Sequence, residues 1–445
     1  MRLKKKGCAS LLIAGCAFLL LLLVAPCQSQ AQESVITPYE NRAQERMSES
    51  NEVQTLADLP GNIHVGPLRI HPSVSVTEAY TSNIFESEYH EKGSWITSTT
   101  PGIVLQLPIQ RHFFQVDYHA DIIESERFHH QYDATSNFVN SGLNLDFNRL
   151  NILAGNNWKS DSTPPQNIND IRKTYLENHA YCDVSYRLAD RYMVTGFYRN
   201  TNRQFDDHRS PWDPTVDPQW DNYMENDMGV DLFYRFMPLT SVLFEYGYTH
   251  RNQTDRGLPD TDRDFDAQRY WLGFKWEPTA KIVGTIKGGY YQRNYAGGST
   301  SQDWSGVAME GDLQYKLTSY DTFSLNAFRK PLETSVNENQ THGFAPGLYG
   351  TYYISSGGIL AYTHKFTYKI SGILNASYYN DNYQETGTLG KRRIDNRVAA
   401  GASAFYRIQD WLALKLGYQF TNCESNAELE SYRESLFFGT LSFTF

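Results

Sequence analysis

Apolar and polar side chains alternate with a period of two along most of this chain. In the segment WLALKLGYQF, Leu414 and Leu416 fall on one face of an extended strand, whereas Lys415 and Gly417 fall on the other. Similar segments recur from about residue 70 to the C-terminus. Because successive side chains of a strand point to opposite faces, this period predicts strands whose two faces meet different environments.

The connections between these segments alternate strictly between short and long ones. Short connections such as NRLN, LADR and MPLT take turns with long, often acidic ones such as QTDRGLPDTDRDFD. This order is typical of a transmembrane meander, in which short turns face the periplasm and long loops face outward. We therefore expect an all-β fold over residues 70–445, a transmembrane antiparallel up-and-down β-barrel of about 18 strands, with strands for example over 113–124, 240–252 and 411–423. A count of 16 also fits, because a Pro- and Gly-rich passage at 331–353 blurs the strand boundaries.

One face of the predicted strands carries charges of both signs. In a small dry barrel such charges would have to be paired, whereas a wide barrel holds water in its lumen. We therefore expect the apolar face to contact lipid and the charged face to line a pore. Two roles for the charges remain open: a field across the pore that orders water, or pairing with neighbours that simply solvates the wall. The predicted pore-lining residues are Asp117, Asp121, Asp227, Asp231, Arg235, Glu245, Arg269, Lys275, Arg393, Asp395, Arg397 and Lys415.

The first 31 residues have the features of a secretory signal peptide. Arg2 and three lysines precede the apolar run CASLLIAGCAFLLLLLVAP, and small residues at Ser29 and Ala31 suit cleavage after Ala31. We expect residues 32–69, which are largely polar, to form a periplasmic N-terminal extension. These features predict a secreted chain that is located in the outer membrane of a Gram-negative cell.

The mature chain is acidic. The signal peptide holds four of the 40 basic residues and none of the 50 acidic ones, so the chain that follows it has a net charge of −14. This charge speaks against a nucleic-acid partner, because nucleic-acid binding depends on basic surface. It suits a surface that meets outer-membrane lipid and lipopolysaccharide with its bound cations.

The first predicted barrel strand reads HPSVSVTEAYTSNIF, which resembles the opening strand of an outer-membrane porin family called β-barrel porin 2. A second stretch, LAYTHKFTYKISGILNASYYNDNY, also resembles this family through its Tyr-x-His-x-Phe-Thr-x-Lys hairpin. The resemblance implies a membrane barrel, and relatives associated with exopolysaccharide systems imply a polysaccharide conduit with secretion components as partners. The family supplies no site residues to transfer. The positions that match its first-strand pattern are Pro72, Ser73, Ser75, Val76, Glu78, Tyr80, Asn83, Ile84 and Phe85.

Two further features predict binding partners. The loop SPWDPTVDPQWD places Trp212 and Trp220 among aspartates, a combination that suits sugar binding, although tryptophans on which the loop itself folds are the alternative. The tail SLFFGTLSFTF ends on Phe445 and resembles the signal that the bacterial barrel-assembly machinery recognises. No motif fixes a catalytic group, and we expect no enzyme activity, no cofactor and no metal site.

The sequence therefore predicts an outer-membrane channel that acts as a passive conduit, with exopolysaccharide export as the first candidate role. A general or solute-selective diffusion porin is the second candidate. A structural or adhesion barrel, whose loops bind a partner, is the alternative from another class.

Overall fold

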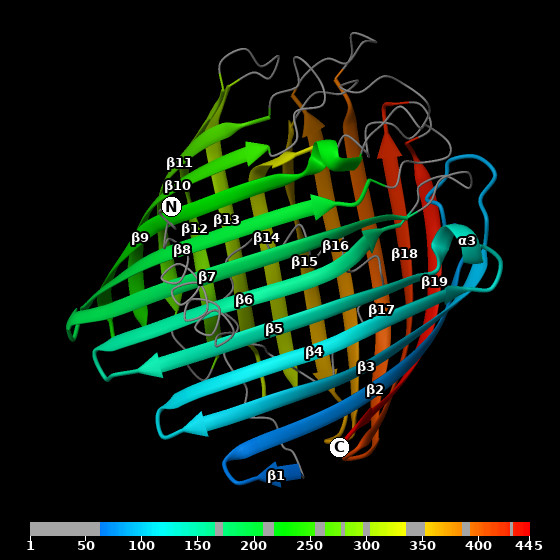
Figure 1. The fold of residues 1–445 in the computed structure, drawn as a ribbon, viewed down its shortest axis with the longest axis horizontal. Coiled ribbons are helices and arrows are strands. Elements are labelled where there is room, and N and C mark those ends of the chain that lie inside the picture. The colour runs from blue at the N-terminus through cyan, green and yellow to red at the C-terminus, as the bar shows by residue number, and fades with distance from the viewer. Residues whose placement is uncertain are drawn as a thin grey trace, which may run out of the picture.

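The computed structural model describes residues 63–164, 172–207, 218–253, 263–276, 281–296, 303–334, 352–384, 392–427 and 430–445. The predicted signal peptide, most of the predicted extension and Trp212 lie outside these ranges. The described residues form one antiparallel sheet of nineteen strands, of which β2 to β19 close into a barrel with strongly tilted strands (Figure 1). The expected count of 18 barrel strands is confirmed.

The strands follow one another around the barrel in chain order, each paired with the next. They lie close to the ranges expected from the sequence, since 113–124, 240–252 and 411–423 correspond to β4, β10 and β18. The strands are β1 Ile63–Val65, β2 Leu68–Thr81, β3 Ser94–Ile109, β4 His112–Ser125, β5 Ala134–Asp146, β6 Leu150–Thr163, β7 Lys173–Ala189, β8 Tyr192–Phe205, β9 Tyr223–Met237, β10 Thr240–Gln253, β11 Phe265–Trp276, β12 Ile282–Tyr295, β13 Trp304–Lys316, β14 Asp321–Glu333, β15 Tyr352–Lys365, β16 Ile370–Tyr383, β17 Ile394–Gln409, β18 Leu412–Ser425 and β19 Tyr432–Thr444.

In the part of the chain that the structure describes, helical structure is confined to two short turns in the long connections, α3 His129–Tyr132 and η1 Pro218–Asp221. Within the described ranges, no helix is long and apolar enough to cross a membrane.

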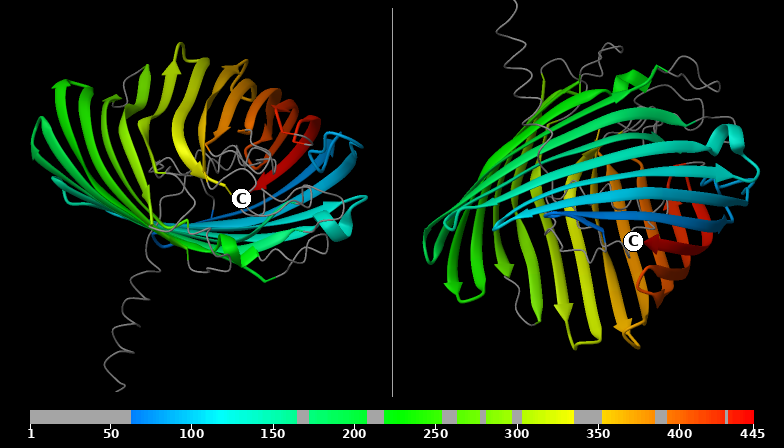
Figure 2. Two further views of the ribbon diagram at one scale, coloured as in Figure 1. Left: turned by 90° about the horizontal axis from the view of Figure 1, so that it is seen from above. Right: turned by 60° about the horizontal axis from the view of Figure 1, so that its bottom comes forward.

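The barrel closes where its last strand pairs with its first. β19 runs antiparallel to β2, with Leu436 opposite Thr81 and Thr444 opposite Ser73. In Figure 2 the red β19 lies beside the blue β2. Backbone groups left unpaired in hydrocarbon each cost several kcal/mol, so only a closed sheet satisfies every strand edge within a membrane.

The short strand β1 extends this seam. β1 turns back at Gly66, which has a φ of 62°, and pairs with Leu68–Ile70 of β2. β19 pairs with the same strand as far as Ser73, and Phe445 donates to the carbonyl of Pro72 at 3.0 Å, so β1 continues the pairing along the first residues of β2. β1 and the start of β2 lie inside the range 32–69. Three residues are too few to show an alternation, so the sequence pattern did not predict this strand.

The two ends of the barrel differ as the alternation of connections predicts. The short turns join β3 to β4, β5 to β6 and so on, at the end where β2 begins and β19 stops. The long connections join β2 to β3, β4 to β5 and so on, at the opposite end (Figure 1). In the blurred passage, β14 stops at Glu333 and β15 begins at Tyr352.

The outer face of the barrel is apolar. Leu272, Val307 and Leu416 have 61%, 65% and 53% of their surface exposed, whereas the carboxylate residue Glu245 has 2%. This distribution inverts that of a soluble protein and matches a barrel that is surrounded by lipid.

Aromatic side chains mark both edges of the apolar band. Near the long connections, the hydroxyls of Tyr118, Tyr198 and Tyr378 each donate to an asparagine on the next strand, at 2.8–3.0 Å. At the other end Trp411 stacks on Phe445, with ring centroids 6.4 Å apart. Aromatic girdles of this kind sit at the two membrane interfaces.

The assignment of faces predicts opposite outcomes for two adjacent substitutions in β18. Leu416→Lys places an ammonium on the lipid side, which costs about 2–4 kcal/mol near the bilayer midplane, so the free energy of unfolding in lipid should fall by that amount. Lys415→Leu changes the other face and should leave stability and assembly nearly intact. Equilibrium unfolding in lipid vesicles measures both, and equal tolerance of the two variants would contradict the assignment.

The charged inner wall

An ion-pair network spans five neighbouring strands on the face opposite to the apolar one. The guanidinium of Arg269 on β11 contacts Glu245 on β10 at 2.6 Å and Asp227 on β9 at 2.7 Å. Lys287 on β12 contacts Glu245 at 2.7 Å and Glu310 on β13 at 2.8 Å. Two of these contacts reach over an intervening strand. Side chains two strands apart converge only on the concave side of a curved sheet, so this face is the inner wall of the barrel.

A glycine on β10 makes the contact between Arg269 and Asp227 feasible. Gly247 on β10 lies directly opposite Arg269, and a Cβ at Gly247 would collide with the guanidinium. The arginine therefore lies across β10 and reaches Asp227 with both terminal nitrogens, at 2.7 and 2.9 Å. Thr249 also donates to Asp227 at 2.8 Å, which fixes the carboxylate from β10.

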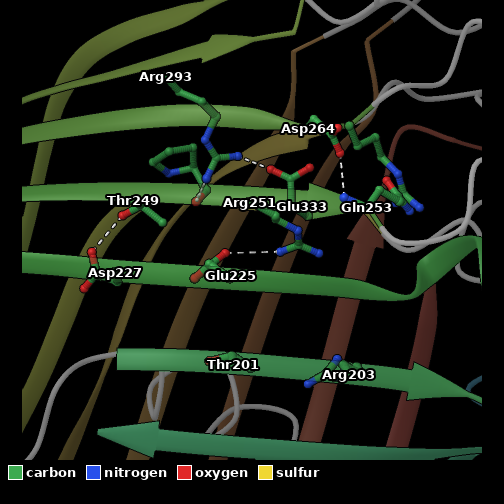
Figure 3. Close-up of polar contacts among 12 residues, drawn as sticks. Thr201, Arg203, Glu225, Asp227, Thr249, Arg251, Gln253, Asp264, Arg293 and Glu333 are labelled. Atoms are coloured by element: carbon green, nitrogen blue, oxygen red, sulfur yellow. Dashed lines mark hydrogen bonds and ion pairs between the residues drawn. The ribbon is translucent and has the colours of Figure 1, made fainter. Parts of the chain in front are cut away.

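A second layer of ion pairs lies closer to the long connections (Figure 3). Arg251 contacts Glu225 at 3.5 Å and Arg293 forms an ion pair with Glu333, which lies two strands away on β14. The guanidinium of Arg251 also lies 3.6 Å from the centre of the Tyr223 ring. Cation–π contact of this kind adds about 0.5–2 kcal/mol and holds the side chain against the wall.

The same layer continues onto β6 to β8. Glu177 on β7 accepts from Arg203 on β8 at 2.5 Å and contacts Lys159 on β6 at 3.2 Å. The Arg203 guanidinium lies between the rings of Tyr175 and Tyr223, 4.9 and 5.6 Å from their centres. Rings and cations thus alternate along this part of the wall.

These contacts bear on the two roles that the sequence left open for the charges. In each pair the cation and the carboxylate stand on adjacent strands or two strands apart, on the same side of the barrel. The opposite charges therefore compensate each other locally rather than across the pore. Partly buried ions retain their charge only when paired, so pairing accounts for the pattern without a field across the lumen.

The predicted pore-lining residues fall into separate groups. Asp227, Glu245 and Arg269 belong to the central network, and Asp231 lies opposite Glu245 in the register of β9 and β10. Lys275 lies 5.2 Å from the centre of the Phe233 ring on the same wall. The structure places Arg235 opposite Ser241, on the same face of β9 as Asp231.

The remaining predicted residues lie elsewhere around the barrel. Asp117 contacts His119 at 3.7 Å, and Asp121 accepts from Thr100 at 2.7 Å. Near the long connections, Arg393 contacts both Asp395 and Glu430, at 2.7 and 2.9 Å. The other two lie on β17 and β18. Arg397 stands opposite Cys423, and the ammonium of Lys415 lies 5.6 Å from the centre of the Phe438 ring.

Sequence reasoning missed several members of the network, namely Lys159, Glu177, Arg203, Lys287, Arg293, Glu310 and Glu333. The segment GTIKGGYYQRN around Lys287 has glycine and tyrosine on both faces, so its alternation is weak. The register of β11 and β12 places Lys287 opposite Gly273, on the same face as Arg269. The short connection between these two strands is the sequence signal that could have indicated this register.

The wall formed by β2 and β3 has a different character. Ser73, Ser75 and Thr77 share the inner face of β2, and the Thr77 hydroxyl forms a hydrogen bond with that of Thr440 at 3.0 Å across the seam. Ser98 on β3 pairs with Thr77 and continues this face. The dense ion-pair and ring layers thus lie on the wall from β6 to β14, whereas this stretch of β2 and β3 carries small hydroxyl side chains.

Of the two tryptophans predicted to bind sugar, Trp212 lies outside the described residues. Trp220 belongs to η1, and its carbonyl oxygen accepts from Gln253 and, at 2.9 Å, from Arg263. Arg263 also donates to the carbonyl of Thr334 at 2.5 Å, so it links three long connections. Across the described ranges, no group of three or more His, Cys, Asp or Glu side chains is arranged to hold a metal ion.

Comparison with solved structures gives matches of low identity. A crystal structure of Pseudomonas aeruginosa OpdK with vanillate matches at 9% identity and a TM-score of 0.45, over 84% of this chain and 99% of that one. Acinetobacter baumannii OccAB4 matches at 12% identity and a TM-score of 0.45, over 84% and 98%. Pseudomonas aeruginosa OpdL matches at 12% identity and a TM-score of 0.43, over 85% and 98%. No curated protein sequence matches the chain.

A family match covers nearly the whole described chain. The family described as "Putative beta-barrel porin 2" matches residues 60–444, which begin just before β1 and include every strand of the barrel. This match agrees with the resemblance of the first strand, with the closed barrel and with its apolar outer face. The chain therefore belongs to the beta-barrel porin 2 family, and it is an outer-membrane β-barrel of the porin type.

Proposed function

We propose that this barrel is a passive, water-filled conduit for hydroxyl-rich, uncharged solutes, with exopolysaccharide leaving the cell as its substrate class. The observation that carries the proposal is the lining of the inner wall, where charges of both signs neutralise one another beside aromatic rings. Barrels of 16–18 strands are wide enough to hold an aqueous channel.

The chemistry of the two walls supports this substrate class. A neutral sugar is not excluded by a wall whose cations and anions are paired, as they are at Arg269, Glu245 and Lys287. The hydroxyl side chains of β2 and β3 offer weak, exchangeable hydrogen bonds elsewhere on the wall. Passage requires binding that is favourable enough for entry and weak enough for release, and a lining of this kind meets both conditions.

The channel activity is tested by single-channel recording of the purified protein in a planar lipid bilayer. We expect stepwise currents that are proportional to voltage, because water and ions fill a lumen of this strand number. Absence of any current would contradict the conduit and favour the structural or adhesion barrel.

The substrate class is tested in cells that lack the gene. We expect surface polysaccharide to fall and uptake of small solutes to stay unchanged, and a plasmid copy should restore the polysaccharide. Unchanged polysaccharide with reduced solute uptake would instead identify a diffusion porin for small solutes.

The balance of charge on the wall gives a further prediction. Arg269→Met removes the cation that Asp227 and Glu245 share, so the wall becomes locally negative and the reversal potential in a KCl gradient should shift toward K⁺ selectivity. Arg269→Lys keeps the charge and should restore the wild-type potential.

Arg433→Met is the matched control for Arg269→Met. It removes the same charge from β19, where Arg433 lies on the outward side and donates to Asn422 at 3.1 Å. We expect its reversal potential to equal that of the wild type. If Arg269→Met also left the potential unchanged, the charged wall would not line the conducting path.

A further inference from the structure

Several glycines on the inner face lie directly opposite an aromatic or arginine side chain of the neighbouring strand, and its ring or guanidinium lies over the glycine. Each of them stands near the middle of its strand, so together they form a band around mid-height of the barrel. Among the residues that the structure describes, five pairs have this form: Gly155 with Tyr181, Gly229 with Phe197, Gly247 with Arg269, Gly357 with Tyr379 and Gly417 with Phe438.

In each pair the large side chain occupies space that a Cβ of the glycine would need, and at Gly229 and Gly357 a backbone carbonyl oxygen occupies it as well. A Cβ at any of the five positions would lie within 3.0 Å of ring or guanidinium atoms of its partner, a distance that real Cβ atoms essentially never show. The partner side chain therefore lies over the glycine, flat against the sheet. Phe197 and Tyr379 are accordingly buried, with 7% and 2% of their surface exposed.

The alternative position for such a side chain is toward the axis of the barrel. Side chains occupy a small set of staggered rotamers, and a rotamer that is blocked by a new Cβ is replaced by another one. On the inner face, a ring that leaves the sheet projects into the lumen, because the backbone and the adjacent inward side chains occupy the remaining directions.

We propose that these glycines set the bore of the lumen at mid-height, by keeping the large side chains opposite them flat against the wall. They act as positioning residues, since each works through its partner. The inference rests on the proposed conduit and deepens it, because the bore limits the largest solute that passes.

The test compares Gly417→Ala and Gly155→Ala with the wild type by single-channel recording, because the three atoms nearest to an added Cβ at each position all belong to the partner side chain. We expect the conductance to fall, on the order of 10–20% for one ring in a lumen of this strand number. The largest polyethylene glycol that enters the pore, measured by its effect on conductance, should become smaller.

Two further variants separate a change of bore from a general effect on folding. Gly196→Ala is the matched control, because Gly196 lies on the outward side of β8 opposite Val184, and a Cβ added there would have no atom within 4 Å. Its conductance should equal that of the wild type. In the double variant Gly417→Ala with Phe438→Ala the ring is absent, so the conductance should return to the wild-type value or exceed it.

Two outcomes would overturn the inference while the conduit stands: unchanged conductance and polymer size limit in both glycine variants, or a double variant that conducts no better than Gly417→Ala alone. A wild-type protein that carries no current would instead contradict the proposed function itself.

Discussion

The structure depends on a single constraint, which is that no backbone hydrogen-bonding group of a strand is left unpaired within the membrane. The pairing of β19 with β2 meets this constraint for the barrel as a whole, from Leu436 opposite Thr81 to Thr444 opposite Ser73. Once the sheet is closed, every strand has one face toward lipid and one toward the lumen. The two-residue period of the sequence, the apolar outer surface and the polar interior all follow from this closure.

The fold was predictable because this constraint acts on every strand in the same way. Leu416 and Lys415 show it in adjacent residues, since the first is 53% exposed on the lipid side and the second lies on the inner wall beside Phe438. The alternation of short and long connections also predicted which end of the barrel carries the turns and which end carries the loops. By contrast, β1 was not predictable, because its three residues are held by pairing with β2 rather than by a pattern of their own.

The inner wall was predictable only in part. The face on which Asp227, Glu245 and Arg269 lie follows from their positions within their strands. That one arginine joins both carboxylates depends on the register between β9, β10 and β11, and on the absence of a side chain at Gly247. Lys287 was not predicted, because glycines and tyrosines on both faces of β12 weaken the alternation there. Alternation is a property of one strand, whereas the network is a property of several.

The seam also determines the order in which the barrel can form. Thr77 and Thr440, which meet across it, are 363 residues apart, whereas the other neighbouring strands of the barrel are joined by a single turn or loop. Contacts at such separation form late, because the entropy of closing the ring is paid before they are made. Until β19 arrives, β2 has an open edge from Ser73 to Thr81, while β1 already protects the stretch from Leu68 to Ile70. The short N-terminal strand thus reduces the length of exposed edge on which another chain could pair during assembly.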